Sequence, residues 1–132
     1  MGLLLVALAG CGRPAAAPLA QVKGRVFYRG RPLPGGTIVF TPDPERGGHG
    51  PQACAEIGPD GRYQLRTGPE PGAVPGWHRV TVAPASPAPG GDAPPTRNLS
   101  PALPARYSDP EQSGECREVK LGQLNTLDLH LQ

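Results

Sequence analysis

Proline and glycine recur along this whole chain, with 19 residues of each type among 132. Average usage of the two types together is roughly 12%, which this chain far exceeds. Proline lacks a backbone donor and interrupts helices, while glycine favours turns. We therefore exclude a bundle of long helices and expect short strands joined by many turns.

Charge and hydrophobicity place the chain among small folded modules. Hydrophobic residues make up 37% of the sequence, and the formal net charge is +2, which argues against a fully disordered chain. The length favours one domain with a core of valine, leucine and isoleucine, too small for a large catalytic cleft. The 13 basic residues form no concentrated patch, so we expect no nucleic-acid partner.

The first ten residues carry no charge and are mostly apolar. A bilayer span needs about 20 apolar residues, whereas about 7 to 15 are typical of the apolar region of a secretory signal. We therefore expect residues 1–10 to form a signal peptide that is removed from the mature protein.

The end of this apolar run has a distinctive motif. Leu8-Ala9-Gly10-Cys11 resembles the lipobox of bacterial lipoproteins. The resemblance implies that the sulfur of Cys11 receives a diacylglyceryl group and that Cys11 becomes the mature N-terminus. Several acyl chains would then hold the protein on a bacterial membrane, facing the periplasm or displayed at the cell surface. Residues 11–20, rich in proline and alanine, would form a tether between the lipid and the folded module. The alternatives to a lipoprotein signal are an ordinary secretory signal and a buried strand, each followed by a cysteine only by chance.

The remainder, residues 21–132, has the pattern of a β domain. Gly58-Pro59-Asp60-Gly61 predicts a hairpin turn, and the proline-rich residues 84–104 predict a disordered or surface loop. Seven short strands indicate an all-β sandwich. Alternating or apolar segments predict these strands at 22–28, 37–41, 53–57, 62–67, 77–83, 115–121 and 125–131.

The order of several segments carries a second resemblance. Residues 22–33, 59–65 and 74–82 resemble carboxypeptidase regulatory-like domains, which have a transthyretin-like β-sandwich. Residues 103–110 are similar to small planctomycete-type lipoproteins of that fold. The resemblance implies a single seven-stranded sandwich of transthyretin-like or Ig-like type, located in the cell envelope. It does not imply a reaction.

Two further cysteines follow Cys11, namely Cys54 and Cys116. A protein that leaves the reducing cytosol can oxidise such a pair, so a disulfide between them is one prediction. The two would have to lie on neighbouring strands. The alternative is two unpaired thiols.

The histidines do not predict a metal site. His49, His78 and His130 lie far apart in the sequence, without the close pairing of zinc ligands. We expect His78 in the core and the other two in solvent, with no metal and no cofactor. Hydroxyisourate hydrolases of the transthyretin-like class end in Tyr-Arg-Gly-Ser, whereas this chain ends in Leu129-His130-Leu131-Gln132, so we expect no such activity. The sequence has no Gly-x-Ser-x-Gly motif, phosphate loop or paired carboxylates, so we expect no catalytic residues.

Aromatic residues offer a route to ligand binding. Trp77 lies on the outward phase of its predicted strand, while Tyr107 and Tyr28 lie elsewhere in the module. Our main hypothesis is a non-catalytic structural or protein-interaction module, held to the membrane by lipid. The alternative is a carbohydrate-binding module in which these three aromatics meet. The partner would be an envelope protein for the first hypothesis and a polysaccharide for the second. A third option is an envelope enzyme with an unrecognised site.

Overall fold

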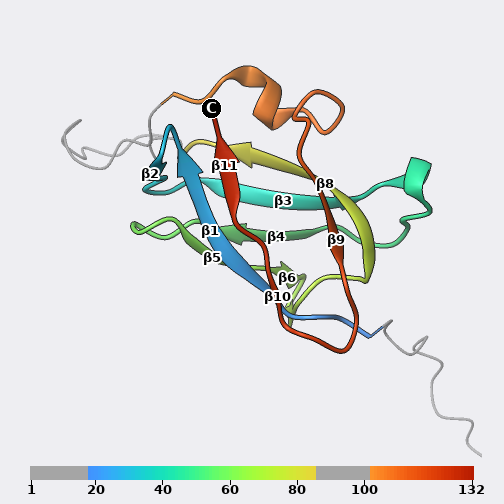
Figure 1. The fold of residues 1–132 in the computed structure, drawn as a ribbon. Helices are drawn as coiled ribbons and strands as arrows, with labels where there is room; N and C mark the ends of the chain where they lie inside the picture. The colour runs from blue at the N-terminus through green and yellow to red at the C-terminus, as the bar shows by residue number, and fades with distance from the viewer. Residues whose placement is uncertain (1–17, 86–101) are drawn as a thin grey trace, which may run out of the picture.

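A computed structural model describes residues 18–85 and 102–132, which are built mainly from β-strands in two sheets (Figure 1). Two short 3₁₀ helices, η1 (Pro44–Arg46) and η2 (Ala105–Ser108), accompany them. The strands are β1 (Val22–Tyr28), β2 (Arg31–Pro32), β3 (Thr37–Pro42), β4 (Ala53–Glu56), β5 (Arg62–Gln64), β6 (Arg66–Thr67), β7 (Glu70–Pro71), β8 (Gly76–Ala83), β9 (Cys116–Val119), β10 (Asn125–Thr126) and β11 (Leu129–Leu131).

Strand β1 is the centre of the first, five-stranded sheet. β10 and β11 run parallel to β1 along one of its edges, and β5 and β2 run antiparallel along the other. The last strands of the chain therefore lie beside the first. Alternate residues of β1 face opposite sides, so Val22 and Val26 are buried while Lys23 is exposed.

The second, six-stranded sheet has the order β7-β6-β4-β3-β8-β9 and is antiparallel throughout. β3 and β8 form its longest pairing, from Thr37 opposite Ala83 to Pro42 opposite His78. β9 is an edge strand, paired with β8 alone. This position explains why β9 carries Arg117 and Glu118, because an edge strand of a sheet is less enclosed than a central one.

One apolar core lies between the two sheets. The first sheet supplies Val22, Val26 and Leu129, and the second supplies Phe40 and Val80, all almost completely buried. The all-β prediction is therefore confirmed, with two sheets packed over a shared core.

The strand pattern is finer than predicted. Each of the seven predicted segments contains strand, but two of them are split. The additional two-residue strands β2 and β7 form between the predicted strands. The segment 62–67 divides at Leu65, where the chain leaves β1 and joins β4 in the other sheet. The turn at Gly58–Gly61 forms as predicted, but β5 pairs with β1 rather than with β4.

Candidate functional site

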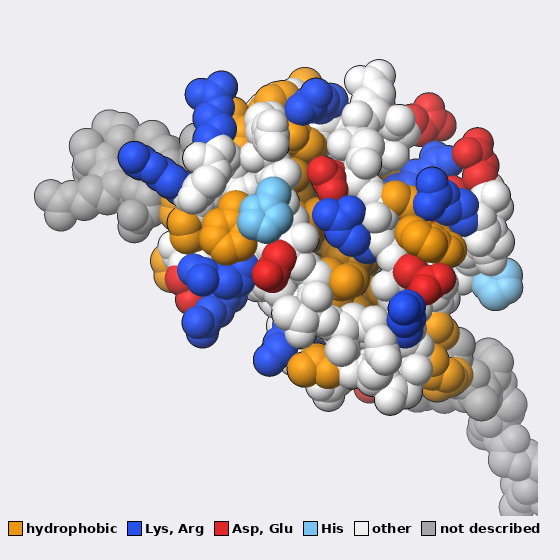
Figure 2. All heavy atoms as spheres, in the orientation of Figure 1, with side chains coloured by type: hydrophobic (Ala, Val, Ile, Leu, Met, Phe, Trp, Pro, Cys, Tyr) orange, Lys and Arg blue, Asp and Glu red, His pale blue; other side chains and the backbone are white. Residues whose placement is uncertain are grey.

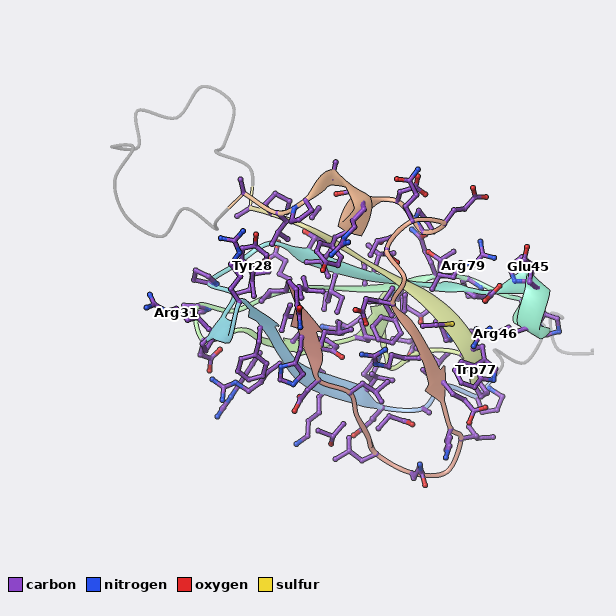
Figure 3. The ribbon with its side chains drawn as sticks, turned by 45° about the horizontal axis from the view of Figure 1, so that its top comes forward. Tyr28, Arg31, Glu45, Arg46, Trp77 and Arg79 are labelled. Carbon is purple, nitrogen blue, oxygen red and sulfur yellow. The ribbon has the colours of Figure 1, made fainter. Side chains whose placement is uncertain are left out.

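The three aromatics proposed as a joint ligand site do not converge. Tyr28 ends β1, where the guanidinium of Arg29 lies 5.3 Å from its ring centroid. Trp77 lies in β8, and Figure 3 shows the two residues at opposite ends of the molecule. Tyr107 is 4% exposed and belongs to the core. The prediction of one binding surface formed by Trp77, Tyr107 and Tyr28 is therefore wrong.

Tyr107 has a structural role instead. It lies in η2, and its hydroxyl donates to the carbonyl of Gln132 at 3.0 Å and accepts the N–H of Gln132 at 2.9 Å. Arg106 donates to the same hydroxyl at 2.9 Å. These bonds attach η2 to the residue that follows β11, so the phenol closes one end of the core.

Trp77 is half-buried and forms part of a polar cluster at the other end. The guanidinium of Arg46 lies 4.9 Å from its ring centroid, a cation–π arrangement. The backbone carbonyl of Trp77 accepts the N–H of Asp43 at 2.9 Å. The contacts of Trp77 with Arg46 and Asp43 thus connect β8 to the segment around η1.

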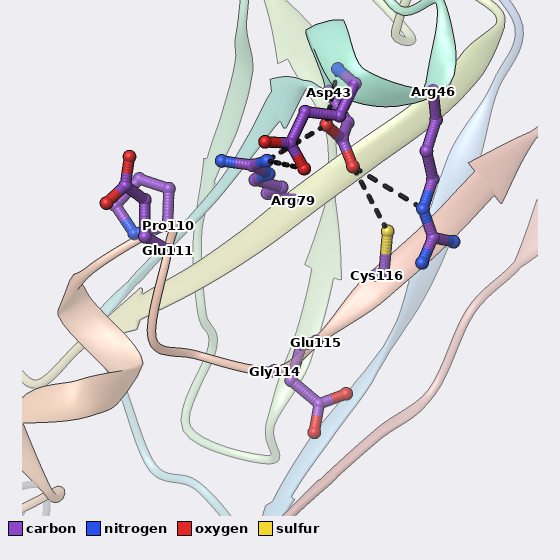
Figure 4. A pocket seen from close by; sticks show the side chains of 9 residues that line it. Asp43, Arg46, Arg79, Pro110, Glu111, Gly114, Glu115 and Cys116 are labelled. Atoms are coloured by element: carbon purple, nitrogen blue, oxygen red, sulfur yellow. Dashed lines mark hydrogen bonds and ion pairs between the residues drawn. The ribbon is translucent and has the colours of Figure 1, made fainter.

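Asp43 is the centre of this polar cluster (Figure 4). Its Oδ1 caps η1 by accepting the N–H of Glu45 at 3.0 Å, and it lies 3.2 Å from a terminal nitrogen of Arg79. Its Oδ2 lies 3.6 Å from Nε of Arg46 and 3.9 Å from the thiol of Cys116. An aspartate followed by proline is a recognised capping pattern at the start of a helix. This pattern explains why the sequence forms the short helix η1 at this point.

The cluster borders an open depression of about 480 Å³ between the η1 loop and the segment before β9. Arg79 also contacts Glu45, at 3.1 Å, so its guanidinium joins two carboxylates. Glu115 pairs with Arg117 at 3.0 Å. Most of the charged groups here are therefore occupied by one another, and the arrangement holds η1, β8 and β9 together.

The chemistry that the depression can support is limited. The Cys116 thiol lies 3.9 Å from the Asp43 carboxylate, at the long end of the range for a thiol donor, which is a weak one. In residues 18–85 and 102–132, no three histidine, cysteine or acidic side chains are grouped to hold a metal ion. The geometry favours a structural role for this cluster.

The histidines are placed as the sequence predicted. His78 is fully buried, its Nε2 lies 2.8 Å from the carbonyl of Val74, and its ring lies 5.8 Å from that of Phe40. Burial lowers the pKa of His78 below its ordinary value, and nearby backbone groups of Val74 and Phe40 offset part of this shift. His49 and His130 are exposed.

The predicted disulfide between Cys54 and Cys116 is wrong, because both thiols are free. Cys54 lies in β4 and Cys116 in β9, with β3 and β8 between them. Three interstrand steps of about 4.8 Å place the two backbones about 14 Å apart. A disulfide requires Cα atoms within about 7 Å.

Several predicted features lie outside the described residues: the signal peptide, Cys11, most of the tether at 11–20, and residues 86–101 of the proline-rich loop. Among the residues that the structure describes, no helix is long and apolar enough to cross a membrane. Comparison of the chain with models of known families, with curated proteins and with solved structures found no match.

Proposed function

We propose that this chain is a bacterial envelope lipoprotein that displays a small, non-catalytic β-sandwich as an interaction module. The observation that carries the proposal is Leu8-Ala9-Gly10-Cys11 at the end of a short apolar run, ahead of a folded module that starts at β1. A lipid on Cys11 would attach the module to the membrane. The nine residues 12–20 would reach about 30 Å when extended, which keeps the module near the membrane surface.

The non-catalytic part of the proposal is supported by the charged cluster around Asp43. Arg79 contacts both Asp43 and Glu45, and Arg46 lies between the Asp43 carboxylate and the Trp77 ring. Groups engaged in this way stabilise the module and are poorly placed to react with a substrate. We also assign the sandwich to the transthyretin-like or Ig-like type, as a carboxypeptidase regulatory-like domain, a proposal supported by its two packed sheets.

Metabolic labelling tests this proposal in a bacterial host. The full chain, its Cys11→Ser variant and a Cys54→Ser control are expressed with an alkyne-bearing palmitate analogue, and the membrane fractions are collected. We expect label and membrane association for the wild type and for Cys54→Ser, because Cys54 is a free thiol in the folded module. Cys11→Ser should carry no label and should leave the membrane fraction. An unlabelled wild type, or equal labelling of Cys11→Ser, would overturn the proposal.

A further inference from the structure

The outer face of the five-stranded sheet carries side chains that the core does not use. On β1, Lys23, Arg25 and Phe27 alternate with buried residues and point away from the six-stranded sheet. The register places Thr126 of β10 beside Lys23, and His130 of β11 beside Phe27. This surface, which we call the β1 face, combines cations with aromatic rings.

Phe27 and His130 form a flat platform on the β1 face. Their rings stack with centroids 4.9 Å apart and planes 6° from parallel, and His130 is exposed. The guanidinium of Arg25 lies 5.3 Å from the Phe27 ring centroid. In Figure 2 a histidine lies against a hydrophobic side chain over β1 and β11, with basic side chains close by. Half-exposed stacked rings of this kind suit the flat C–H face of a sugar ring, because apolar groups pack well on the faces of aromatic rings.

A hollow of about 760 Å³ adjoins the platform and shares Arg25 with it. Its lining includes Lys23, Arg25, Arg62 and Gln64 as donors, with Glu56 and Asp128 as carboxylates. A mixture of donors and acceptors in an open hollow is suited to a ligand rich in hydroxyl groups.

Two cations of this hollow, Lys23 and Arg25, are available to a ligand, beside the carboxylates of Glu56 and Asp128. Within residues 18–85 and 102–132, neither the Lys23 amine nor the Arg25 guanidinium belongs to an ion pair. Arg25 donates to the backbone carbonyl of Asp60, at 3.1 and 3.4 Å, and Oδ1 of Asp128 accepts the backbone N–H of Arg25 at 2.9 Å. Lys23 and Arg25 can therefore pair with carboxylates of a ligand.

We propose that the β1 face binds an acidic polysaccharide, with a sugar ring on Phe27 and His130 and a uronic carboxylate at Lys23 and Arg25. The open sheet surface lets a polymer continue beyond the bound residues. This inference rests on the proposed function, because display at the envelope gives the module access to such polymers. It names the partner class of that interaction module.

The binding test uses alginate, a polymer of uronic acids, with neutral dextran as comparison. The detergent-solubilised full chain should bind alginate, should bind dextran much more weakly, and should lose alginate affinity as salt rises. Lys23→Ala and Phe27→Ala should each weaken alginate binding by about tenfold. Arg66→Ala removes an exposed cation of the other sheet, and Trp77→Ala removes an aromatic of that sheet. Neither residue lines the hollow, so both variants should bind alginate as the wild type does.

The urea concentration at the midpoint of unfolding, measured for each variant, separates a loss of binding from a loss of folding. Because Lys23 is exposed, Lys23→Ala should leave this midpoint unchanged. Absent alginate binding, equal binding of dextran, or equal loss in Arg66→Ala would overturn the inference. If phosphatidylglycerol vesicles displace alginate, and their binding requires Lys23 and Phe27, the β1 face binds a membrane. This result would also overturn the inference. If the protein carries the palmitate label and stays on the membrane but does not bind alginate, this inference is refuted and the lipid anchor stands. If the protein binds alginate but carries no label, the lipid anchor is refuted and this inference stands.

Discussion

The carboxylate of Asp43 and the guanidinium of Arg79 lie 3.2 Å apart where the η1 loop meets β8, and the Asp43 side chain is only 5% exposed. A buried charge is costly unless it is paired and hydrogen-bonded. Asp43 meets this condition through Arg79, Arg46 and the N–H of Glu45. The ion pair therefore connects the stability of the loop to that of the six-stranded sheet.

Replacing Asp43 by asparagine should destabilise the protein. The amide keeps an oxygen that can cap η1 but removes the charge that faces Arg79, so we expect the free energy of unfolding to fall by about 1–3 kcal/mol. Urea denaturation measures this change. Asp60→Asn is the matched control, because the Asp60–Arg62 pair is exposed and should contribute less than about 1 kcal/mol. Equal losses in the two variants would contradict a structural role for the Asp43 cluster.

The stacking of Arg46 on Trp77 should appear as a coupling energy. In a double-mutant cycle of Trp77→Ala and Arg46→Ala, we expect the two effects on unfolding free energy to be non-additive by about 0.5–1 kcal/mol. Trp77→Ala alone should lower stability by about 1–3 kcal/mol, because the indole is half-buried. Strict additivity would show that the guanidinium and the indole do not interact in solution.

Stability should fall in mildly acidic solution through His78. Because burial lowers the pKa of His78 in the folded protein, the unfolded chain binds the extra proton first as the pH falls below about 6.5. The free energy of unfolding should therefore decrease between pH 7 and pH 5.5. This slope should be reduced in His78→Gln and retained in His130→Gln, since His130 is exposed. An identical slope in all three proteins would contradict the buried, neutral imidazole.

Gly24 should not tolerate a side chain. A Cβ at this position would lie 2.0 Å from the carbonyl oxygen of Leu127, in the segment between β10 and β11. The Tyr63 hydroxyl donates to that same carbonyl. Gly24→Ala should therefore force β1 and the C-terminal strands apart, with a loss of about 3 kcal/mol or more in unfolding free energy.

Gly30→Ala is the comparison for Gly24→Ala. Gly30 has a φ of 80°, and nothing lies within 4 Å of its added Cβ, so only backbone strain of about 1 kcal/mol is expected. A smaller loss in Gly24→Ala than in Gly30→Ala would disprove the close approach of β1 to Leu127.

Local pattern was sufficient to locate the strands but not to pair them. Alternation reports which residues of a strand share a face, and His78 lies in the core as predicted. It does not report which strand lies alongside. The switch between sheets at Leu65 depends on tertiary contacts, because the N–H of Leu65 bonds to Val22 while Arg66 pairs with Cys54. A local hairpin was therefore predicted where the chain crosses over.

The candidate sites were harder to predict for the same reason. The alternation of Lys23, Arg25 and Phe27 was visible, but the stack of Phe27 on His130 requires the parallel pairing of the first and last strands. The pattern Asp43-Pro44-Glu45 could have indicated a helix cap. The contact of the Asp43 carboxylate with Arg79 could not be predicted, because that contact depends on the pairing of β3 with β8.

Mass spectrometry of the mature N-terminus tests the proposed lipoprotein most directly. Protein extracted from membranes of the expression host is digested, and its N-terminal peptide is identified. We expect this peptide to begin at Cys11 and to carry a diacylglyceryl group on the sulfur. A peptide that begins at Met1, cleavage at any other position, or an unmodified Cys11 would contradict the proposal.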